Sequence, residues 1–160
     1  MQNNLNNLNE VLTRRMFDYF FDKEVKRAHR YRLFFSLVLA QPNIRLSSKG
    51  INARVKKKEI MNTVTCLISR EIRNSDIIGW FDKGKLFIIL VETDNHTPVK
   101  VGERLIDSIK TYNFGEDKVS LSIGAVCFPT DGVDTQAIID KAASLLSQAR
   151  VKGENQILLP

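Results

Sequence analysis

Apolar residues recur at helical spacing in four stretches of this chain. The first stripe predicts a helix packed on a core, and its members are Phe17, Phe20, Phe21, Val25 and Ala28. The stretches 60–68, 101–109 and 138–149 repeat this spacing and predict three more helices. Thr97-Pro98 fits the N-terminal end of the third helix, as N-cap and first helical residue.

Short apolar runs between these helices predict β-strands. The runs are residues 33–40, 77–81, 86–91, 119–128 and 156–159. Pro42 closes the first, a buried central strand, and Gly84 lies in the polar tip of a hairpin, where it can take a positive φ. The order α-β-α-β-β-α-β-α-β predicts an α/β (α+β) domain with a mixed sheet flanked by helices. Its βαββαβ portion is typical of a ferredoxin-like, palm-type arrangement.

The bulk composition fits one globular domain. The chain has 160 residues, of which 43% are hydrophobic and 26% charged. No apolar run approaches the length of a membrane span, and no secretory signal is visible, so we expect a cytoplasmic protein without membrane contact. Cys66 and Cys127 are expected to be buried thiols, which fits a reducing compartment.

The Asn-rich start defines a separate element. Leu5, Leu8 and Leu12 follow helical spacing, so residues 1–12 are predicted to form an N-terminal helical extension that precedes a domain over 13–160. Three alternatives stay open for this segment. It pairs with its copy in a second chain, it is a frayed end, or it is the end of a linker.

The net charge of +6 and the pI of about 9.4 suit a polyanionic partner, whether a nucleotide, a nucleic acid or an acidic lipid. The lysine run at 56–58 is interpreted as a solvated helix face. Nucleic acid is not expected, because no recognition motif is present and the basic residues are not interleaved with aromatic ones. His29 and His96 lack metal-ligand spacing.

Several segments resemble the GGDEF, or diguanylate cyclase, family in order and separation. They are RRMFDYFFDKEVKRAHRYRLFFSLVLAQPN (14–43), ISREIRNSDIIGWFDKGKLFIILVETD (68–94), VSLSIGAVCFPTDG (119–132) and DKAASLLSQARVKGENQI (140–157). The resemblance implies a GGDEF-type nucleotide-cyclase palm fold from about residue 10 onward. Such domains make cyclic di-GMP from two GTP molecules held on facing domains, with magnesium ions between the hairpin, the first strand and the triphosphate.

The signature positions depart from the family pattern. The family's Gly-Gly-Asp/Glu-Glu-Phe falls on Asp82, Lys83, Gly84, Lys85 and Leu86. The family's Asp-x-Asp on the first strand falls on Gln41-Pro42-Asn43, so neutral amides replace both acids. Magnesium prefers anionic oxygen ligands, and a lysine beside it costs several kcal/mol at an effective dielectric of ~20. These substitutions predict a degenerate domain that is not an enzyme, has no catalytic or metal-binding residues and needs no magnesium cofactor.

The family's guanine-contacting positions fall on Lys49 and Lys58. Two interpretations stay open for the lysines that surround this region. Lys49, Lys58, Lys83 and Lys85 either cradle the phosphates of some other anion or form a solvated surface.

A second motif matches the family's inhibitory site, which binds cyclic di-GMP through Arg-x-x-Asp. Asp76 lies six residues before Asp82, Arg73 supplies the arginine, and Arg104 fits a further arginine on the next helix. An arginine fork matches the O6 and N7 atoms of guanine, and an aspartate can accept hydrogen bonds from the opposite edge of the base. The structural alternatives are a helix-dipole role for Arg73, a turn-capping role for Asp76 and ion pairing for Arg104.

These observations lead to two hypotheses for function. The first is a catalytically inactive domain that acts as a cyclic di-GMP receptor in bacterial second-messenger signalling, with Arg73, Asp76 and Arg104 as ligand contacts. The second is a protein-interaction module, a homodimer or a scaffold for a signalling partner, that docks through the N-terminal helix or the altered hairpin.

Overall fold

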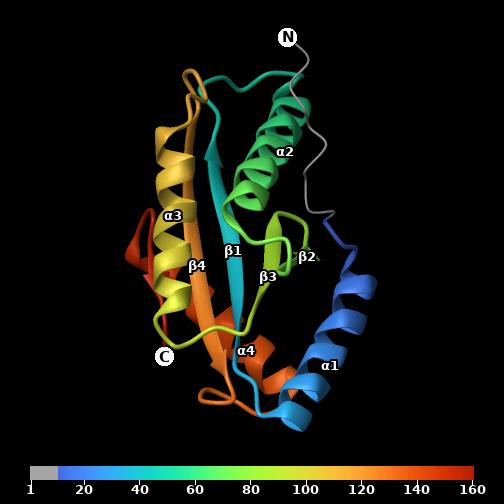
Figure 1. The fold of residues 1–160 in the computed structure, drawn as a ribbon. Coiled ribbons are helices and arrows are strands. Elements are labelled where there is room, and N and C mark those ends of the chain that lie inside the picture. The colour runs from blue at the N-terminus through green and yellow to red at the C-terminus, as the bar shows by residue number, and fades with distance from the viewer. Residues whose placement is uncertain (1–10) are drawn as a thin grey trace.

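A computed structural model describes residues 11–160 of the chain, so residues 1–10 of the helical extension predicted over 1–12 lie outside the described residues. The helices and strands follow the predicted order, which is thereby confirmed (Figure 1). They are α1 (Arg14–Tyr31), β1 (Phe35–Arg45), α2 (Ala53–Glu71), β2 (Ile77–Asp82), β3 (Lys85–Val91), α3 (Thr97–Thr111), β4 (Lys118–Phe128), α4 (Thr135–Lys152) and β5 (Ile157–Leu158).

The five strands form one mixed sheet in the order β2-β3-β1-β4-β5. The central strand β1 runs antiparallel to both of its neighbours, β3 and β4, whereas β5 runs parallel to β4. Because β2 is antiparallel to β3, it is parallel to β1, and the helix α2 connects these two strands. By the same reasoning β3 and β4, which lie on either side of β1, are parallel to each other, and the helix α3 connects them. Two β-α-β units are therefore interleaved, which confirms the predicted mixed α/β class.

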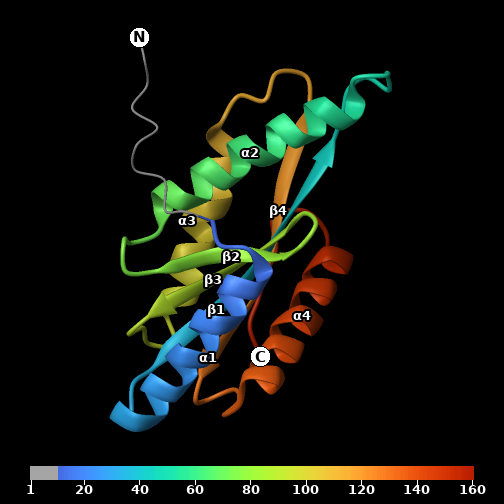
Figure 2. The same ribbon diagram turned by 90° about the vertical axis from the view of Figure 1, so that its right-hand side faces the viewer.

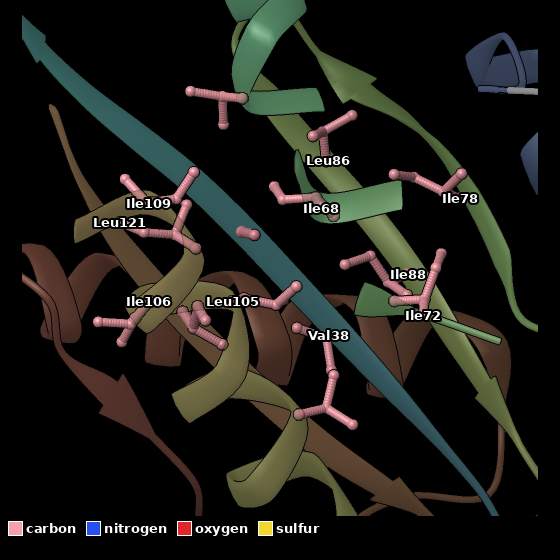
Figure 3. Close-up of a cluster of buried hydrophobic side chains, with 14 of the residues drawn as sticks. Val38, Ile68, Ile72, Ile78, Leu86, Ile88, Leu105, Ile106, Ile109 and Leu121 are labelled. Carbon is pink, nitrogen blue, oxygen red and sulfur yellow. The ribbon is translucent and has the colours of Figure 1, made fainter. Parts of the chain in front are cut away.

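Helices cover both faces of the sheet (Figures 1 and 2). Side chains of α2 and α3 pack on one face, in the cluster of Figure 3 that contains Val38, Ile68 and Leu105. Side chains of α1 and α4 pack on the other face with Leu37 and Leu39. Successive β1 residues thus alternate between two cores, because side chains along a strand point to opposite faces. A strand that is buried on both faces explains the continuous apolar run in the sequence.

The strand β1 extends further than predicted, because it continues through Pro42 to Arg45. Its ladder with β3 ends at Ala40, whereas its ladder with β4 runs on to Arg45. Beyond Ala40 no strand of residues 11–160 pairs with β1 on the β3 side, so the missing N–H of Pro42 is tolerated there. The polar end of β1 consequently projects beside the hairpin.

The chain enters α1 alongside the hairpin strand β2. Leu12 donates its N–H to the Ile78 carbonyl and accepts the N–H of Trp80, each at 2.9 Å, which makes a parallel bridge to Gly79. Thr13 then caps α1 by accepting the N–H of Met16 at 3.3 Å. The chain is therefore extended at Leu12, where a helix was predicted.

Other predictions about single side chains have mixed outcomes. Phe17 and Phe21 are buried as expected, whereas Phe20 is 40% exposed and lies outside the core. Cys127 is buried and Cys66 is half-buried, and both thiols are unbridged. Within residues 11–160, the helices are too short or too polar to cross a membrane.

Candidate ligand-binding sites

The turn between α2 and β2 places the Arg-x-x-Asp motif. The Asp76 carboxylate accepts the backbone N–H of Arg73 at 2.9 Å through Oδ2 and that of Val91 at 3.2 Å through Oδ1. The Arg73 Nε atom lies 3.6 Å from Asp76 Oδ2. Asp76 thus ties the end of α2 to the end of β3, which is the turn-capping role considered from the sequence.

The guanidinium groups of Arg73 and Arg104 lie at the same end of α2. The Arg73 side chain is 56% exposed, and its Nη2 atom donates to the Val91 carbonyl at 3.1 Å. The Arg104 side chain is 53% exposed and reaches across from α3, where Nη2 donates to the Glu71 carbonyl and Nε lies 3.6 Å from the Glu71 carboxylate. The structure therefore brings two accessible cations to the turn that Asp76 holds.

Asp76 itself is nearly inaccessible. Its side chain is 2% exposed, and each carboxylate oxygen accepts a main-chain N–H. Contact with a ligand at this turn would fall mainly to the two guanidinium groups, with Asp76 fixing the backbone beneath Arg73.

The hairpin presents the signature positions at the opposite end of β2. Its turn contains Gly84 with φ of 83°, as predicted, and the Lys85 ammonium lies 3.2 Å from the Asp82 carboxylate. Arg14 fixes the hairpin to α1, because its guanidinium stands 4.5 Å from the centre of the Phe81 ring and donates to the Phe81 carbonyl at 2.9 Å.

A cleft of about 1030 Å³ opens between this hairpin, the polar end of β1 and α2. Its cationic side chains are Arg54, Lys57, Lys58 and Lys83, and apolar surface comes from residues that include Pro42, Met61 and Trp80. Lys58 and Lys83 belong to the cradle considered from the sequence, whereas Lys49 lines an adjoining pocket.

Sequence reasoning missed Arg54, Lys57 and Trp80 as cleft residues. The signal for the first two was available, since Arg54, Lys57 and Lys58 follow the i, i+3, i+4 spacing that places residues on one helix face.

The donor set of this cleft does not fit a magnesium ion. Its carboxylate, Asp82, is paired with Lys85, and the amide of Asn43 on the nearby strand donates to Ser122 Oγ at 3.1 Å. The amide oxygen of Gln41 is buried and finds no hydrogen-bond partner in the part of the chain that the structure describes. Across residues 11–160, no three or more His, Cys, Asp or Glu side chains gather as a metal site. Magnesium binds through carboxylates and waters, which the cations here would oppose.

The arrangement of sheet, helices and hairpin is that of a nucleotide-cyclase palm domain. The chain belongs to the GGDEF family, because the family model described as "Diguanylate cyclase, GGDEF domain" matches residues 4–156. The resemblance seen in the sequence is thereby confirmed. No curated protein matches the chain in sequence.

Solved structures share this fold at low sequence identity. The active GGEEF domain of a diguanylate cyclase from Vibrio cholerae superposes with a TM-score of 0.82 at 20% identity, covering 94% of this chain and 97% of its own. The coiled coil and GGDEF domain of DgcB from Caulobacter crescentus, in complex with c-di-GMP, gives 0.80 at 14% identity and covers 95% and 83%. Diguanylate cyclase SiaD from Pseudomonas aeruginosa, in complex with its activator SiaC, gives 0.77 at 18% identity and covers 99% and 62%.

These matches correct one prediction. The substitutions in the hairpin and on β1 led to the expectation that the domain is not an enzyme. That prediction is wrong, because the matching family is that of diguanylate cyclases and the fold superposes on an active cyclase domain.

Proposed function

We propose that this GGDEF domain binds cyclic di-GMP through the guanidinium groups of Arg73 and Arg104. In this proposal Asp76 fixes the backbone of the turn between α2 and β2. The observation that supports this most is that both arginine side chains are more than half exposed at the same end of α2. Cyclic di-GMP carries two phosphodiester charges and two guanine bases, and an arginine fork can pair with either kind of group.

The anchoring contacts of both arginines are compatible with this role. The Nη2 atom of Arg73 donates to the Val91 carbonyl, and the Nη2 atom of Arg104 donates to the Glu71 carbonyl. A guanidinium group carries its N–H donors in a fixed planar fork, so the carbonyl bond also fixes the plane of the group at this turn.

The expected energetics favour more than one ligand molecule per site. A bidentate arginine contact contributes about 1–3 kcal/mol. Micromolar affinity requires about 8 kcal/mol, and the ordering of ligand and side chains opposes binding. Two arginines therefore suffice only if the ligand binds as a stacked pair or if a second subunit supplies a further arginine.

Isothermal titration with cyclic di-GMP tests the proposal. Wild-type protein should bind, and Arg73→Ala and Arg104→Ala should each weaken binding by about tenfold or more, which corresponds to 1.4 kcal/mol. Arg30→Ala, a change of an exposed arginine at the end of α1, is the matched control and should leave the affinity unchanged. The absence of binding heat in the wild type, or wild-type affinity in both site variants, would reject the proposal.

A cytoplasmic location in bacterial second-messenger signalling follows from this proposal. Cyclic di-GMP is an intracellular nucleotide in the family that the chain belongs to, and the unpaired thiols of Cys66 and Cys127 suit a reducing compartment.

A second candidate function is homodimerisation through α1. Met16, Tyr19 and Phe20 follow i, i+3, i+4 spacing, and all of them are exposed. The charged side chains beside this stripe are paired within the helix, Arg14 with Asp18 and Lys26 with Asp22. Light scattering should give a dimer mass for the wild type and a monomer mass for Tyr19→Glu with Phe20→Glu; a wild-type monomer at high concentration contradicts this candidate.

A further inference from the structure

We infer that the basic tip of the domain, formed by residues 45–58, docks on the surface of an anionic lipid bilayer. The tip consists of the end of β1, the loop that follows it and the first turns of α2 (Figure 1). Arg73 and Arg104 lie at the other end of α2. The inference therefore does not rest on the function proposed above, and either can fail without the other.

The basic tip carries the whole excess of positive charge of the chain. Residues 45–58 contain six lysine or arginine residues and no aspartate or glutamate. The other 18 of the 24 basic residues are matched by 18 acidic ones, so the net charge of +6 comes from this segment alone. Positive charge concentrated in one place attracts a polyanionic surface.

The protein itself uses few of these cations. The Lys56 ammonium lies 3.0 Å from the buried carboxylate of Asp117, and Arg45 lies 3.0 Å from the carboxylate of Glu154. The other four are exposed and take part in no ion pair within residues 11–160; they are Lys49, Arg54, Lys57 and Lys58. Most of the charge of the tip is thus available to a partner.

Cations are unfavourable at this place in the helix. The first turn of α2 contains no acidic residue, and Arg54 lies at the end of the helix where the macrodipole is positive. Arg54, Lys57 and Lys58 also follow the i, i+3, i+4 spacing at which like charges repel one another. An anionic surface in front of the tip would offset both effects, so the arrangement favours an anionic partner.

Apolar side chains project from the same tip. Ile51 is fully exposed, and Val55, one helical turn later, is 57% exposed. An apolar residue just before an N-cap, which is Asn52 in α2, often packs back on the first turns of the helix. The full exposure of Ile51 shows that it does not. A Cβ atom on the neighbouring Gly50 would meet no atom within 4 Å, so this loop is open to solvent.

The turn between α3 and β4 adds an aromatic residue to this end of the molecule. Asp117 joins that turn to the tip, because its carboxylate accepts the N–H of Ser47 at 2.9 Å and pairs with Lys56. The turn carries Tyr112, which is 45% exposed and whose ring centre lies 4.7 Å from that of Phe114. Tyrosine is enriched where the lipid headgroups of a bilayer meet water.

Exposed apolar side chains beside several cations identify the partner as a bilayer surface. A nucleic acid would pair with the cations and leave Ile51 in water. A bilayer takes apolar side chains into its headgroup region, and its acidic lipids attract the cations. Such a contact needs no spanning segment. The expectation of no membrane contact rested on the absence of an apolar span in the sequence, so it does not bear on docking at the surface.

Sedimentation with lipid vesicles tests the inference. The full chain is mixed with vesicles of phosphatidylcholine alone, and with vesicles of equal parts of phosphatidylcholine and phosphatidylglycerol. The protein should sediment with the anionic vesicles only, and high salt should lower its partitioning by about tenfold or more, because salt screens the attraction. No sedimentation with anionic vesicles, or equal sedimentation with both kinds, would overturn the inference.

Ile51→Gln tests the apolar contact without changing the charge. It should lower partitioning onto anionic vesicles by about fivefold or more, because the apolar side chain no longer enters the interface. Val133→Gln is the matched control and should partition as the wild type does. Val133 is also 57% exposed, but it follows the end of β4 that pairs with the first residue of β1. Wild-type partitioning of Ile51→Gln, together with binding to random-sequence DNA, would assign the tip to nucleic acid and reject the bilayer.

A pair of double variants tests whether the charge acts at the tip. Lys49→Ala combined with Arg54→Ala should lower partitioning by about tenfold or more, since each basic residue near an anionic surface contributes to binding. Arg30→Ala combined with Lys100→Ala is the matched control, because it removes the same charge from exposed positions at the end of α1 and the start of α3. Both double variants should keep the thermal midpoint of the wild type. Equal losses in the two would show that the net charge, and not the basic tip, attracts the vesicles.

Discussion

The backbone N–H of Arg73 donates to Asp76 Oδ2 at 2.9 Å, so the two residues of the Arg-x-x-Asp motif are joined through the main chain as well as through their charges. The other oxygen of Asp76 accepts the N–H of Val91. This carboxylate therefore connects a helix end with a strand end, and its primary effect is on the geometry of the turn.

Asp76→Ala is expected to lower the free energy of unfolding by about 1–3 kcal/mol, because two backbone donors lose their buried acceptor. Asp76→Asn should have a smaller effect, since its amide keeps one acceptor oxygen. Urea unfolding measures both variants. Glu103→Ala, at an exposed carboxylate on α3, serves as the control and should change stability by less than about 0.5 kcal/mol. An Asp76→Ala variant with the same free energy of unfolding as the wild type would contradict the structural role of Asp76.

The order of elements was predictable because each strand contains an apolar run and the helices carry apolar residues at helical spacing. The run at residues 33–40 shows why the boundaries were less certain. Pro42 predicted an end to the strand, but a proline ends only the pairing on the side that needs its N–H, and β4 continues past it. Phe20 shows a similar limit, since helical spacing alone does not reveal that it lies at the edge of the stripe.

The candidate sites were predictable in position and less so in role. The spacing of Arg73, Asp76 and Arg104 placed them in one region, yet the sequence does not show that main-chain donors occupy the Asp76 carboxylate. The cleft was harder to predict, because its walls come from segments that are distant in the sequence. Trp80 and Gln41 line the cleft together with residues of α2 because β2 and β1 lie in one sheet. The burial of the Gln41 amide oxygen is also a result of this packing.

Gly124 lies where the backbone of β4 passes close to the backbone of α4. A Cβ atom at this position would stand 2.5 Å from the Ala142 carbonyl oxygen and from the Leu146 nitrogen, both of which are backbone atoms. Gly124→Ala should therefore destabilise the protein by about 1–3 kcal/mol or more, since the helix must move away from the sheet. Gly50→Ala is the matched control, because a Cβ there meets no atom within 4 Å. Thermal unfolding compares the two, and equal midpoints would contradict the close approach.

Arg14 holds the hairpin against α1 by stacking on Phe81 and donating to its carbonyl. Arg14→Ala should lower stability by about 0.5–1 kcal/mol, the contribution of an exposed cation–aromatic contact. It should also speed amide hydrogen exchange in β2 and β3. Arg15→Ala, at the adjacent exposed residue, is the control. Unchanged exchange in the hairpin of the Arg14 variant would show that the hairpin does not depend on this contact.

Asp117 links three segments that meet near the cleft, and this gives the fold a defined acid sensitivity. The backbone N–H of Ser47 and the ammonium of Lys56 hold the pKa of the Asp117 carboxyl below its ordinary value of 3.8. A carboxyl with a lowered pKa in the folded state contributes stability that is fully present above the unfolded-state pKa and is lost as the pH falls through the folded-state pKa.

Asp117→Asn should therefore reduce the stability of the fold near neutral pH and make that stability less dependent on pH below about 4. Lys56→Gln should give an intermediate profile, because the Ser47 bonds remain. Urea unfolding across the acid range measures all three proteins, and parallel profiles for wild type and Asp117→Asn would exclude this source of acid sensitivity.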